Sequence, residues 1–185
     1  MRFAVASEPL AGLKVVERRS IVDHRGSLTR MFCQDDFRNL GIDPAVAQIN
    51  LTVSKTKGAV RGMHFQLPPH AEAKTISCVR GAVFDVAVDI RRGSATFLQW
   101  HAEELTAQNK RTLHIPPGFA HGFQCLEPNS ELLYVHSAPF APGAESGLNA
   151  NDDTLSITWP LAITDLSDRD QGHTMIDDAF EGLTI

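Results

Sequence analysis

Residues 58–93 read GAVRGMHFQLPPHAEAKTISCVRGAVFDVAVDIRRG, and this stretch decides the fold. Within it, residues 84–90 (FDVAVDI) alternate as a strand requires, with apolar side chains on one face and the carboxylates Asp85 and Asp89 on the other. A strand that packs its apolar face against a second layer can turn its acids toward an enclosed space, as jelly rolls and β-barrels do around a polar pocket. Arg61, His64 and Lys74 add cations just upstream. We therefore expect the active site in this stretch.

Short period-two segments continue on both sides of it. We expect strands at residues 13–18, 46–53, 95–105, 111–115, 119–126 and 131–136, separated by Gly and Pro turns. Helical periodicity occurs once, at residues 35–41, where Gly41 ends a turn or two. The pattern predicts an all-β fold, a double-sheet jelly roll or cupin-like β-barrel with a few short helical turns. We expect one domain over residues 1–185, with a core at about 8–170 and an irregular C-terminal tail.

Composition excludes several classes of function. The chain has 185 residues, a formal net charge of -5 and scattered basic residues, so we expect no nucleic-acid partner. Glu8 and Pro9 interrupt the first apolar stretch, and no apolar run approaches the ~20 residues of a membrane span, so we expect neither a signal peptide nor a membrane partner. Cys33, Cys78 and Cys125 have no paired spacing, which is typical of buried thiols in a cytoplasmic protein.

The polar residues of the central stretch suggest acid–base chemistry. A histidine base such as His64 needs a carboxylate to fix its tautomer. The candidates for this carboxylate are Asp85, Asp89 and Asp170. Lys74 could stabilise a developing oxyanion. Strict alternation places Arg61 and His64 on opposite faces, so the two serve one pocket only if a bulge or strand end intervenes.

Residues 116–121 (PPGFAH) match the P-x-G-x-x-H element of the cupin superfamily, in which a turn delivers a histidine to the mouth of the barrel. A metal site in such a fold needs several convergent ligands, usually including a His-x-His pair. The chain has no His-x-His pair, so we expect no metal and an organic role for His121.

Six segments in order carry a more specific resemblance: 48–50 (QIN), 58–65 (GAVRGMHF), 84–91 (FDVAVDIR), 117–123 (PGFAHGF), 159–160 (WP) and 166–170 (LSDRD). Together they resemble the dTDP-4-dehydrorhamnose 3,5-epimerase family, from about residue 8 to residue 170. The resemblance implies a jelly-roll enzyme of deoxysugar biosynthesis that needs no cofactor. It also implies a homodimer in which a strand is exchanged between protomers.

The resemblance assigns catalytic roles that the chemistry requires. A C4 ketone acidifies the protons at C3 and C5, so inversion needs a base on one ring face, an enolate stabiliser, and an acid on the other face. By resemblance, His64 is the base, Asp170 its orienting partner, Lys74 the enolate stabiliser, and Tyr134 the acid. The residues that the resemblance places around the nucleotide and sugar are Arg25, Arg30, Gln48, Asn50, Arg61, Asp85, His121, Phe140, Glu145 and Arg169. Of these, Arg61 would hold the diphosphate, which suits a forked guanidinium.

Three departures from the family pattern leave alternatives open. Arg30 replaces an acid that helps to recognise the base, Glu72 stands where the family commonly has Gln, and Phe140 replaces a second pocket tyrosine. One alternative is a 3- or 5-monoepimerase acting on a different nucleotide sugar, such as a GDP- or CDP-sugar. Another is a sugar-nucleotide-binding cupin without catalysis.

Overall fold

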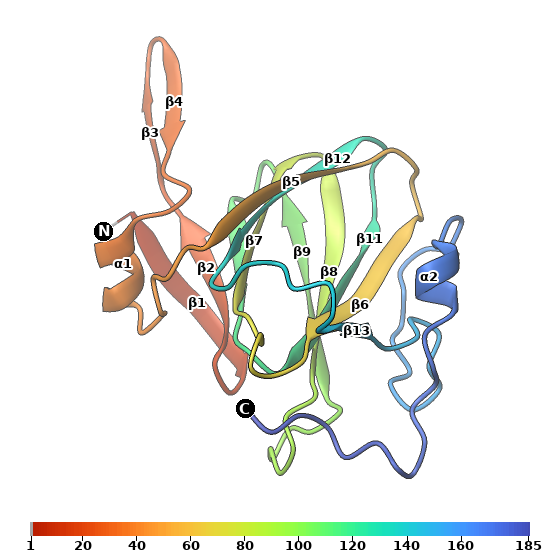
Figure 1. Cartoon of the computed structure of the whole chain (residues 1–185). Helices are drawn as coiled ribbons and strands as arrows, with labels where there is room; N and C mark the ends of the chain where they lie inside the picture. The colour runs from red at the N-terminus through yellow and green to blue at the C-terminus, as the bar shows by residue number, and fades with distance from the viewer. Residues whose placement is uncertain (1) are drawn as a thin grey trace.

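Two antiparallel sheets face each other in the computed structural model, which describes residues 2–185 (Figure 1). The six-stranded sheet contains, in spatial order, β1 (Phe3–Leu10), β2 (Leu13–Arg18), β10 (Arg111–Ile115), β7 (Lys74–Arg80), β12 (Ser130–His136) and β5 (Gln48–Ser54). The five-stranded sheet contains β13 (Glu145–Gly147), β6 (Val60–Gln66), β11 (Phe119–Cys125), β8 (Ala82–Asp89) and β9 (Trp100–Thr106). The sheets do not close into a barrel, and the prediction of an all-β jelly roll is confirmed.

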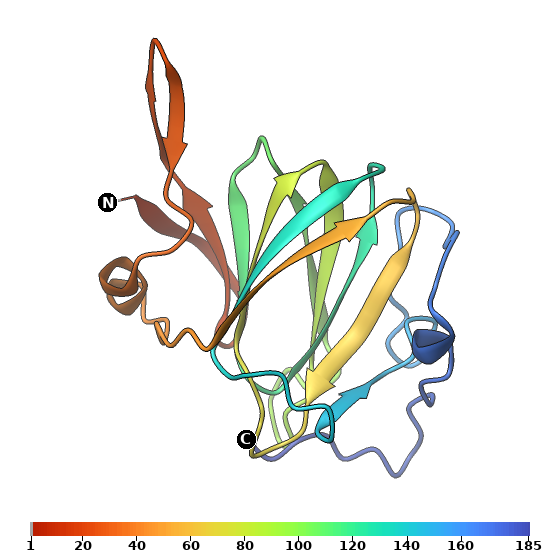
Figure 2. The same ribbon diagram turned by 45° about the horizontal axis from the view of Figure 1, so that its top comes forward.

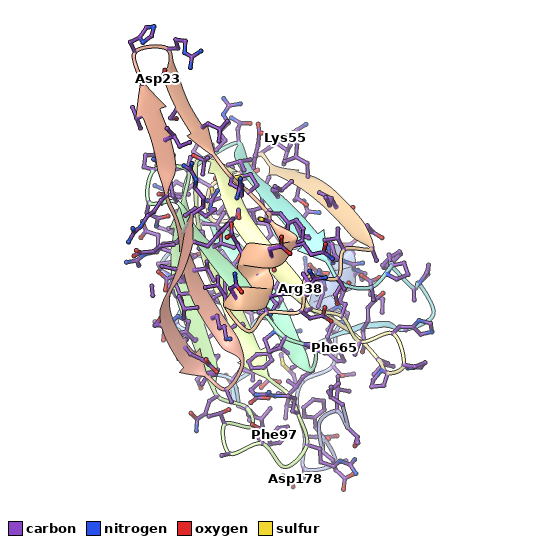
Figure 3. The ribbon with its side chains drawn as sticks, turned by 90° about the vertical axis from the view of Figure 1, so that its left-hand side faces the viewer. Asp23, Arg38, Lys55, Phe65, Phe97 and Asp178 are labelled. Atoms are coloured by element: carbon purple, nitrogen blue, oxygen red, sulfur yellow. The ribbon has the colours of Figure 1, made fainter. Side chains whose placement is uncertain are left out.

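The remaining elements are small. Strands β3 (Ser20–Asp23) and β4 (Gly26–Thr29) form a hairpin that projects away from both sheets, with Asp23 at its tip (Figure 3). Helix α1 (Gln34–Asn39) is the predicted helical turn. Helix α2 (Asp168–Gln171) lies in the C-terminal segment on the outer side of β6 (Figure 2). Neither of the two helices in residues 2–185 has the length and apolar character needed to cross a membrane.

The five-stranded sheet is buried on both faces. Its inner face and the inner face of the six-stranded sheet form one hydrophobic core. Val83 and Ala87 of β8 belong to this core. Its outer face packs under the C-terminal segment, with Val86 and Val88 of β8 in this second cluster. The predicted alternation along β8 is therefore correct, and Asp85 projects toward the space between the sheets.

The predicted start of one strand was wrong, and two elements were not predicted. Strand β9 begins at Trp100 rather than at residue 95, because the hydroxyls of Ser94 and Thr96 each donate to Asp89 Oδ2 at 2.6 Å and hold this segment in a turn. The tail after Trp159 is irregular as predicted, except for α2, in which Ser167 Oγ accepts a hydrogen bond from Asp170 N. Strand β1 was not predicted.

Candidate active site

A cavity of about 330 Å³ opens between the two sheets. Its lining comes from both of them and from the loops at their ends: Gln48, Asn50, Thr52, Arg61, His64, Glu72, Lys74, His121, Phe123, Tyr134, His136, Phe140, Glu145 and Arg169. The cavity is of the size that small-ligand pockets have, and its lining is rich in titratable groups. Such a site suits a polar ligand and acid–base chemistry.

A bulge in β6 allows Arg61 and His64 to serve the same cavity. Against β11, His64 pairs with His121 and Arg61 pairs with Phe123, so three steps along β6 oppose two steps along β11. The extra residue shifts the alternation, as a β-bulge does. Gly62 lies within the bulge at φ +141°, and a Cβ there would overlap the Cα of Gly122. The bulge therefore depends on glycines at both positions.

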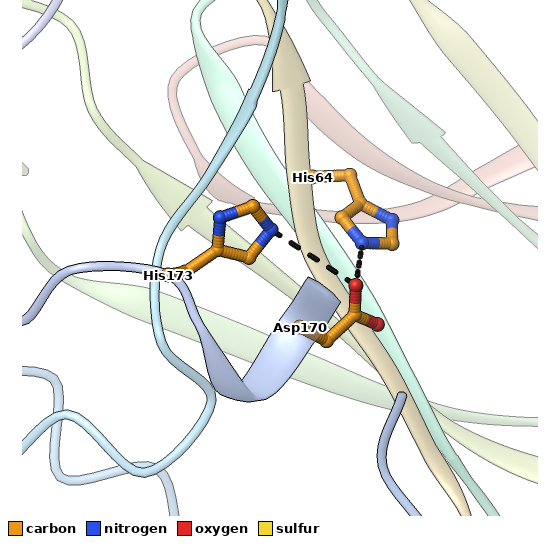
Figure 4. Close-up of side chains that lie close together, drawn as sticks. All are labelled: His64, Asp170 and His173. Carbon is orange, nitrogen blue, oxygen red and sulfur yellow. Dashed lines mark hydrogen bonds and ion pairs between the residues drawn. The ribbon is translucent and has the colours of Figure 1, made fainter. Parts of the chain in front are cut away.

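His64 and Asp170 form a hydrogen-bonded pair at one wall (Figure 4). His64 Nε2 lies 2.8 Å from Asp170 Oδ1, and the amide of Gly62 donates to Asp170 Oδ2 at 3.1 Å. Burial opposes ionisation of Asp170, but the hydrogen bonds from His64 and Gly62 outweigh it and hold the pKa of this carboxyl well below its usual range. Because an ionised carboxylate can only accept, the bond to Asp170 places the hydrogen on Nε2 of His64 and leaves Nδ1 with a free lone pair. Nη2 of Arg169, which can only donate, lies 3.0 Å from the same Nε2 and makes no hydrogen bond to it in this tautomer.

A second imidazole approaches the same carboxylate. His173 Nε2 lies 3.9 Å from Asp170 Oδ1, and burial lowers the pKa of His173. The three ligand-type atoms of His64, Asp170 and His173 lie within 4.8 Å of one another, close enough to consider a metal ion. However, the guanidinium of Arg169 lies 3.0 Å from His64 Nε2 and 3.2 Å from Asp170 Oδ1, so a cation already neutralises this carboxylate. We interpret the cluster as an acid–base pair and not as a metal centre.

Another histidine–carboxylate pair lies deeper, on the same sheet. His121 Nε2 is 3.0 Å from Asp85 Oδ1, and both side chains are almost fully buried. Burial lowers the pKa of His121, which favours the neutral imidazole. Asp85 thus reaches the cavity only through His121, which lines it.

The opposite wall carries Lys74 and Tyr134, from β7 and β12 of the six-stranded sheet. Lys74 Nζ donates to the backbone oxygen of His64 at 3.1 Å and lies 3.4 Å from Glu72 Oε1. The ring of Tyr134 lies between two imidazoles, edge-on to His121 at 5.8 Å and stacked on His136 at 5.7 Å. Burial raises the pKa of Tyr134 well above its ordinary value, so its hydroxyl keeps its proton at neutral pH.

Most of the predicted site residues line this cavity, Asp85 and Asp170 lie behind the histidines that line it, and three others lie elsewhere. Arg25 is paired with Asp23 at the tip of the hairpin, and Arg30 is paired with Asp36 beside α1. Neither arginine lines the cavity within one chain. Asp89, one candidate partner for a histidine base, is instead bound by Arg91 at the end of β8.

Sequence reasoning did not assign five residues of the site: Thr52, Glu72, Phe123, His136 and His173. Two of them carried a usable signal, because Thr52 shares a face with Asn50 and His136 shares one with Tyr134. His173 carried none, since it follows α2 in a segment without periodicity.

The fold and the cavity define a class: a jelly-roll protein whose site places titratable side chains on two facing walls and suits acid–base chemistry. Residues 7–178 match the family described as dTDP-4-dehydrorhamnose 3,5-epimerase. The dTDP-4-dehydrorhamnose 3,5-epimerase of Sinorhizobium fredii is 40% identical over 165 residues, which cover 89% of this chain and 85% of that protein. The dTDP-4-dehydrorhamnose 3-epimerase of Streptomyces niveus is 38% identical over 158 residues, with 85% and 76% covered.

A solved structure agrees with these relatives. The dTDP-4-dehydrorhamnose 3,5-epimerase of Bacillus anthracis str. Ames, with TDP and PPi bound, superposes with a TM-score of 0.92 at 36% identity, covering 94% of this chain and 99% of that one. The chain belongs to the dTDP-4-dehydrorhamnose 3,5-epimerase family.

Proposed function

We propose that the protein inverts C3 and C5 of a nucleotide-linked 4-keto-6-deoxyhexose, converting dTDP-4-dehydro-6-deoxy-D-glucose to dTDP-4-dehydro-L-rhamnose. One observation carries this proposal: His64 and Tyr134 come from opposite sheets and line the same cavity. Inversion at a carbon requires proton removal from one face and proton return to the other. A sugar ring held between the sheets would have a base on one side and an acid on the other.

His64 is the proposed base. Its Nε2–H donates to Asp170, which leaves Nδ1 to accept the proton that the C4 ketone acidifies. Asp170 also stabilises the imidazolium that results, because its pKa is held low enough for it to remain ionised throughout the working pH range. Asp170 is therefore a positioning residue in the proposed reaction.

Lys74 is the proposed enolate stabiliser. When the C3 or C5 proton leaves, negative charge develops on the C4 oxygen, and an ammonium in a poorly hydrated site stabilises such charge strongly. Lys74 has a side chain only 9% exposed and lines the cavity beside His64. No redox step or electron acceptor is required by this chemistry.

Tyr134 is the proposed acid. Its buried hydroxyl remains protonated at neutral pH and can donate to the carbon on the face that His64 does not reach. His121, held from behind by Asp85, would line the floor below the sugar, with Gln48, Asn50 and Glu145 at its edge.

Charged groups at the mouth fit the nucleotide. Arg61 and Arg169 line the same cavity, and two guanidinium groups suit a diphosphate. The Bacillus anthracis relative was solved with TDP and PPi, which supports a thymidine nucleotide here. We place Arg25 and Arg30 in nucleotide recognition of a partner protomer, because neither reaches the cavity of its own chain.

A strand-exchanged homodimer is therefore part of the proposal. The hairpin exposes Val22 and Leu28, which are 71% and 61% accessible. Strand β5 ends the six-stranded sheet and presents Ile49 and Leu51, also more than half exposed. Exposed apolar side chains beside an unpaired sheet edge favour pairing with another chain.

Proton NMR in deuterated water tests the reaction. The pure protein is added to dTDP-4-dehydro-6-deoxy-D-glucose, and the C3 and C5 signals are followed. Loss of both signals with inversion at both centres is the expected result. If neither proton exchanges, with this sugar or with its GDP and CDP counterparts, the proposal fails and a binding role replaces it.

A second candidate, inversion at a single carbon, has one observation in its favour. Phe140 lines the cavity where the family commonly has a tyrosine, so one hydroxyl is missing from the wall. A relative from Streptomyces niveus is a 3-epimerase at 38% identity. Exchange of only one of the two protons in the same experiment would select this candidate.

A further inference from the structure

Glu72 is a buried carboxylate inside the cavity that the proposed reaction does not use. It stands just before β7, and its side chain is only 8% exposed. Its Oε2 accepts a hydrogen bond from His136 Nδ1 at 2.9 Å, and its Oε1 lies 3.4 Å from Lys74 Nζ. One carboxylate therefore contacts both a buried ammonium and an imidazole of the same wall.

Other acids near Lys74 are already engaged. Glu145 on β13 is held by both oxygens at 3.1 Å from Arg169, and Asp85 on β8 is held by His121. Within residues 2–185, Glu72 is the one acid whose oxygen lies within 4.0 Å of Lys74 Nζ. Glu72 is thus the direct counter-charge of the ammonium.

The charge of Glu72 counteracts the effect of burial on the ammonium of Lys74. Burial lowers the pKa of Lys74, and the largest opposing influence is the negative charge of Glu72, followed by those of Glu145 and Asp85. The basic and titratable groups that line the same cavity are Arg61, His64, His121, His136 and Arg169, and of these the two guanidinium groups carry positive charge that opposes the ammonium. Without Glu72, Lys74 would face these cations with only distant, already paired acids.

His136 fixes Glu72 and links it to the proposed acid. Since an ionised carboxylate cannot donate, His136 Nδ1 carries the hydrogen of this bond. Burial opposes ionisation of Glu72, but the hydrogen bond from His136 and the charge of Lys74 outweigh it and hold its pKa below the usual value. The His136 ring stacks on Tyr134 with an interplanar angle of 13°.

We propose that Glu72 is a positioning residue that keeps Lys74 cationic and fixes its ammonium at the C4 oxygen of the substrate, with His136 holding the carboxylate in place. The inference rests on the proposed function for its catalytic meaning. Its structural content, a charge contact that sets the protonation of Lys74, can be measured without any substrate.

The test combines lysine NMR with kinetics of Glu72→Gln. The chain has five lysines, at positions 14, 55, 57, 74 and 110, so ¹³Cε-lysine labelling gives few signals, and Lys74→Arg assigns the one of interest. Glu72→Gln keeps the shape and removes the charge. We expect the titration midpoint of Lys74 to move to lower pH. We expect the alkaline limb of the kcat profile to move to lower pH with the lysine, so that kcat falls above the pH optimum, with a much smaller change in KM.

Glu131→Gln is the matched control, because Glu131 pairs with Arg80 outside the cavity on the strand that carries His136. It should leave the Lys74 midpoint unchanged. A Lys74 midpoint in Glu72→Gln equal to that of the parent overturns the inference. If Glu72→Gln does not fold, Glu72→Asp takes its place in the test, because it moves the carboxylate away from Lys74 by one methylene. A Lys74 titration midpoint equal to that of the parent would again overturn the inference. If the parent protein exchanges no proton of the sugar, the proposed function is wrong. The titration of Lys74 still tests the role of Glu72 in that case, because it requires no substrate.

Discussion

Asp170→Asn is the most informative single change to this site. Asp170 Oδ1 accepts from His64 Nε2 at 2.8 Å, and the side chain is 3% exposed, so water cannot replace the carboxylate. An asparagine has the same shape but can turn its NH₂ group toward His64, which then accepts at Nε2 and carries its hydrogen on Nδ1. The proposed base would then have no free lone pair facing the sugar. In a serine protease, the same change behind a catalytic histidine lowers kcat by about 10⁴.

The expected loss follows from this tautomer argument. We expect kcat to fall by about 10³- to 10⁴-fold, which corresponds to about 4 to 5.5 kcal/mol of activation free energy. Affinity for dTDP should change far less than kcat, because Asp170 does not line the cavity and touches the nucleotide site only through its ion pair with Arg169. Asp168→Asn is the control: it makes the same substitution in the same helix at an exposed position.

The assay follows deuterium incorporation at C3 and C5 by proton NMR, with dTDP affinity measured by calorimetry. Circular dichroism confirms that the variant is folded. If Asp170→Asn exchanges either proton within about tenfold of the parent rate, the carboxylate does not set the tautomer of the base, and His64 is not activated in the way described here.

Three further changes test the acid, the bulge and the assembly. Tyr134→Phe should retain deuterium exchange at the α-carbon yet lower inversion by about 10²-fold or more, because only the proton return is lost; equal loss of both would refute the role of an acid. Gly62→Ala should lower the free energy of unfolding in urea by about 3 kcal/mol, because the new Cβ would overlap Gly122 and the backbone at position 62 has a φ of +141°. A variant as stable as the parent would show that the bulge tolerates a side chain. If the proposed dimer forms, Val22→Asp together with Leu28→Asp should shift it to monomer in analytical ultracentrifugation, and a mass equal to that of the parent dimer would remove the hairpin from the interface.

Alternation predicted the faces of strands well because it is a local property. Asp85 and Val86 project to opposite sides of β8, and Asn50 faces the cavity while Leu51 is exposed, as the period-two pattern required. The shared orientation of Tyr134 and His136 was predictable for the same reason.

The bulge in β6 was left open because its cause is not local. It depends on the close approach of Gly62 to Gly122, and these residues come from strands distant in the sequence.

Buried polar groups in loops are equally hard to predict. Asp152 lies in a loop with a neighbouring acid, yet it is 3% exposed and accepts from the amides of Thr154 and Leu155, so its burial is satisfied by backbone geometry that composition does not report.

The difference in burial between the two walls of the cavity matches the proposed roles of Tyr134 as the acid and His64 as the base. Tyr134 belongs to the core between the sheets as well as to the cavity, and its side chain is almost fully buried. A hydroxyl in that position holds its proton until a carbanion is presented to it. His64 lies nearer the solvent, with 23% of its side chain exposed, and can pass its proton to water before the next substrate arrives. Tyr134, the proposed acid that must keep its proton, therefore lies in the core, and His64, the proposed base that must release a proton, lies at the solvent-exposed edge of the cavity.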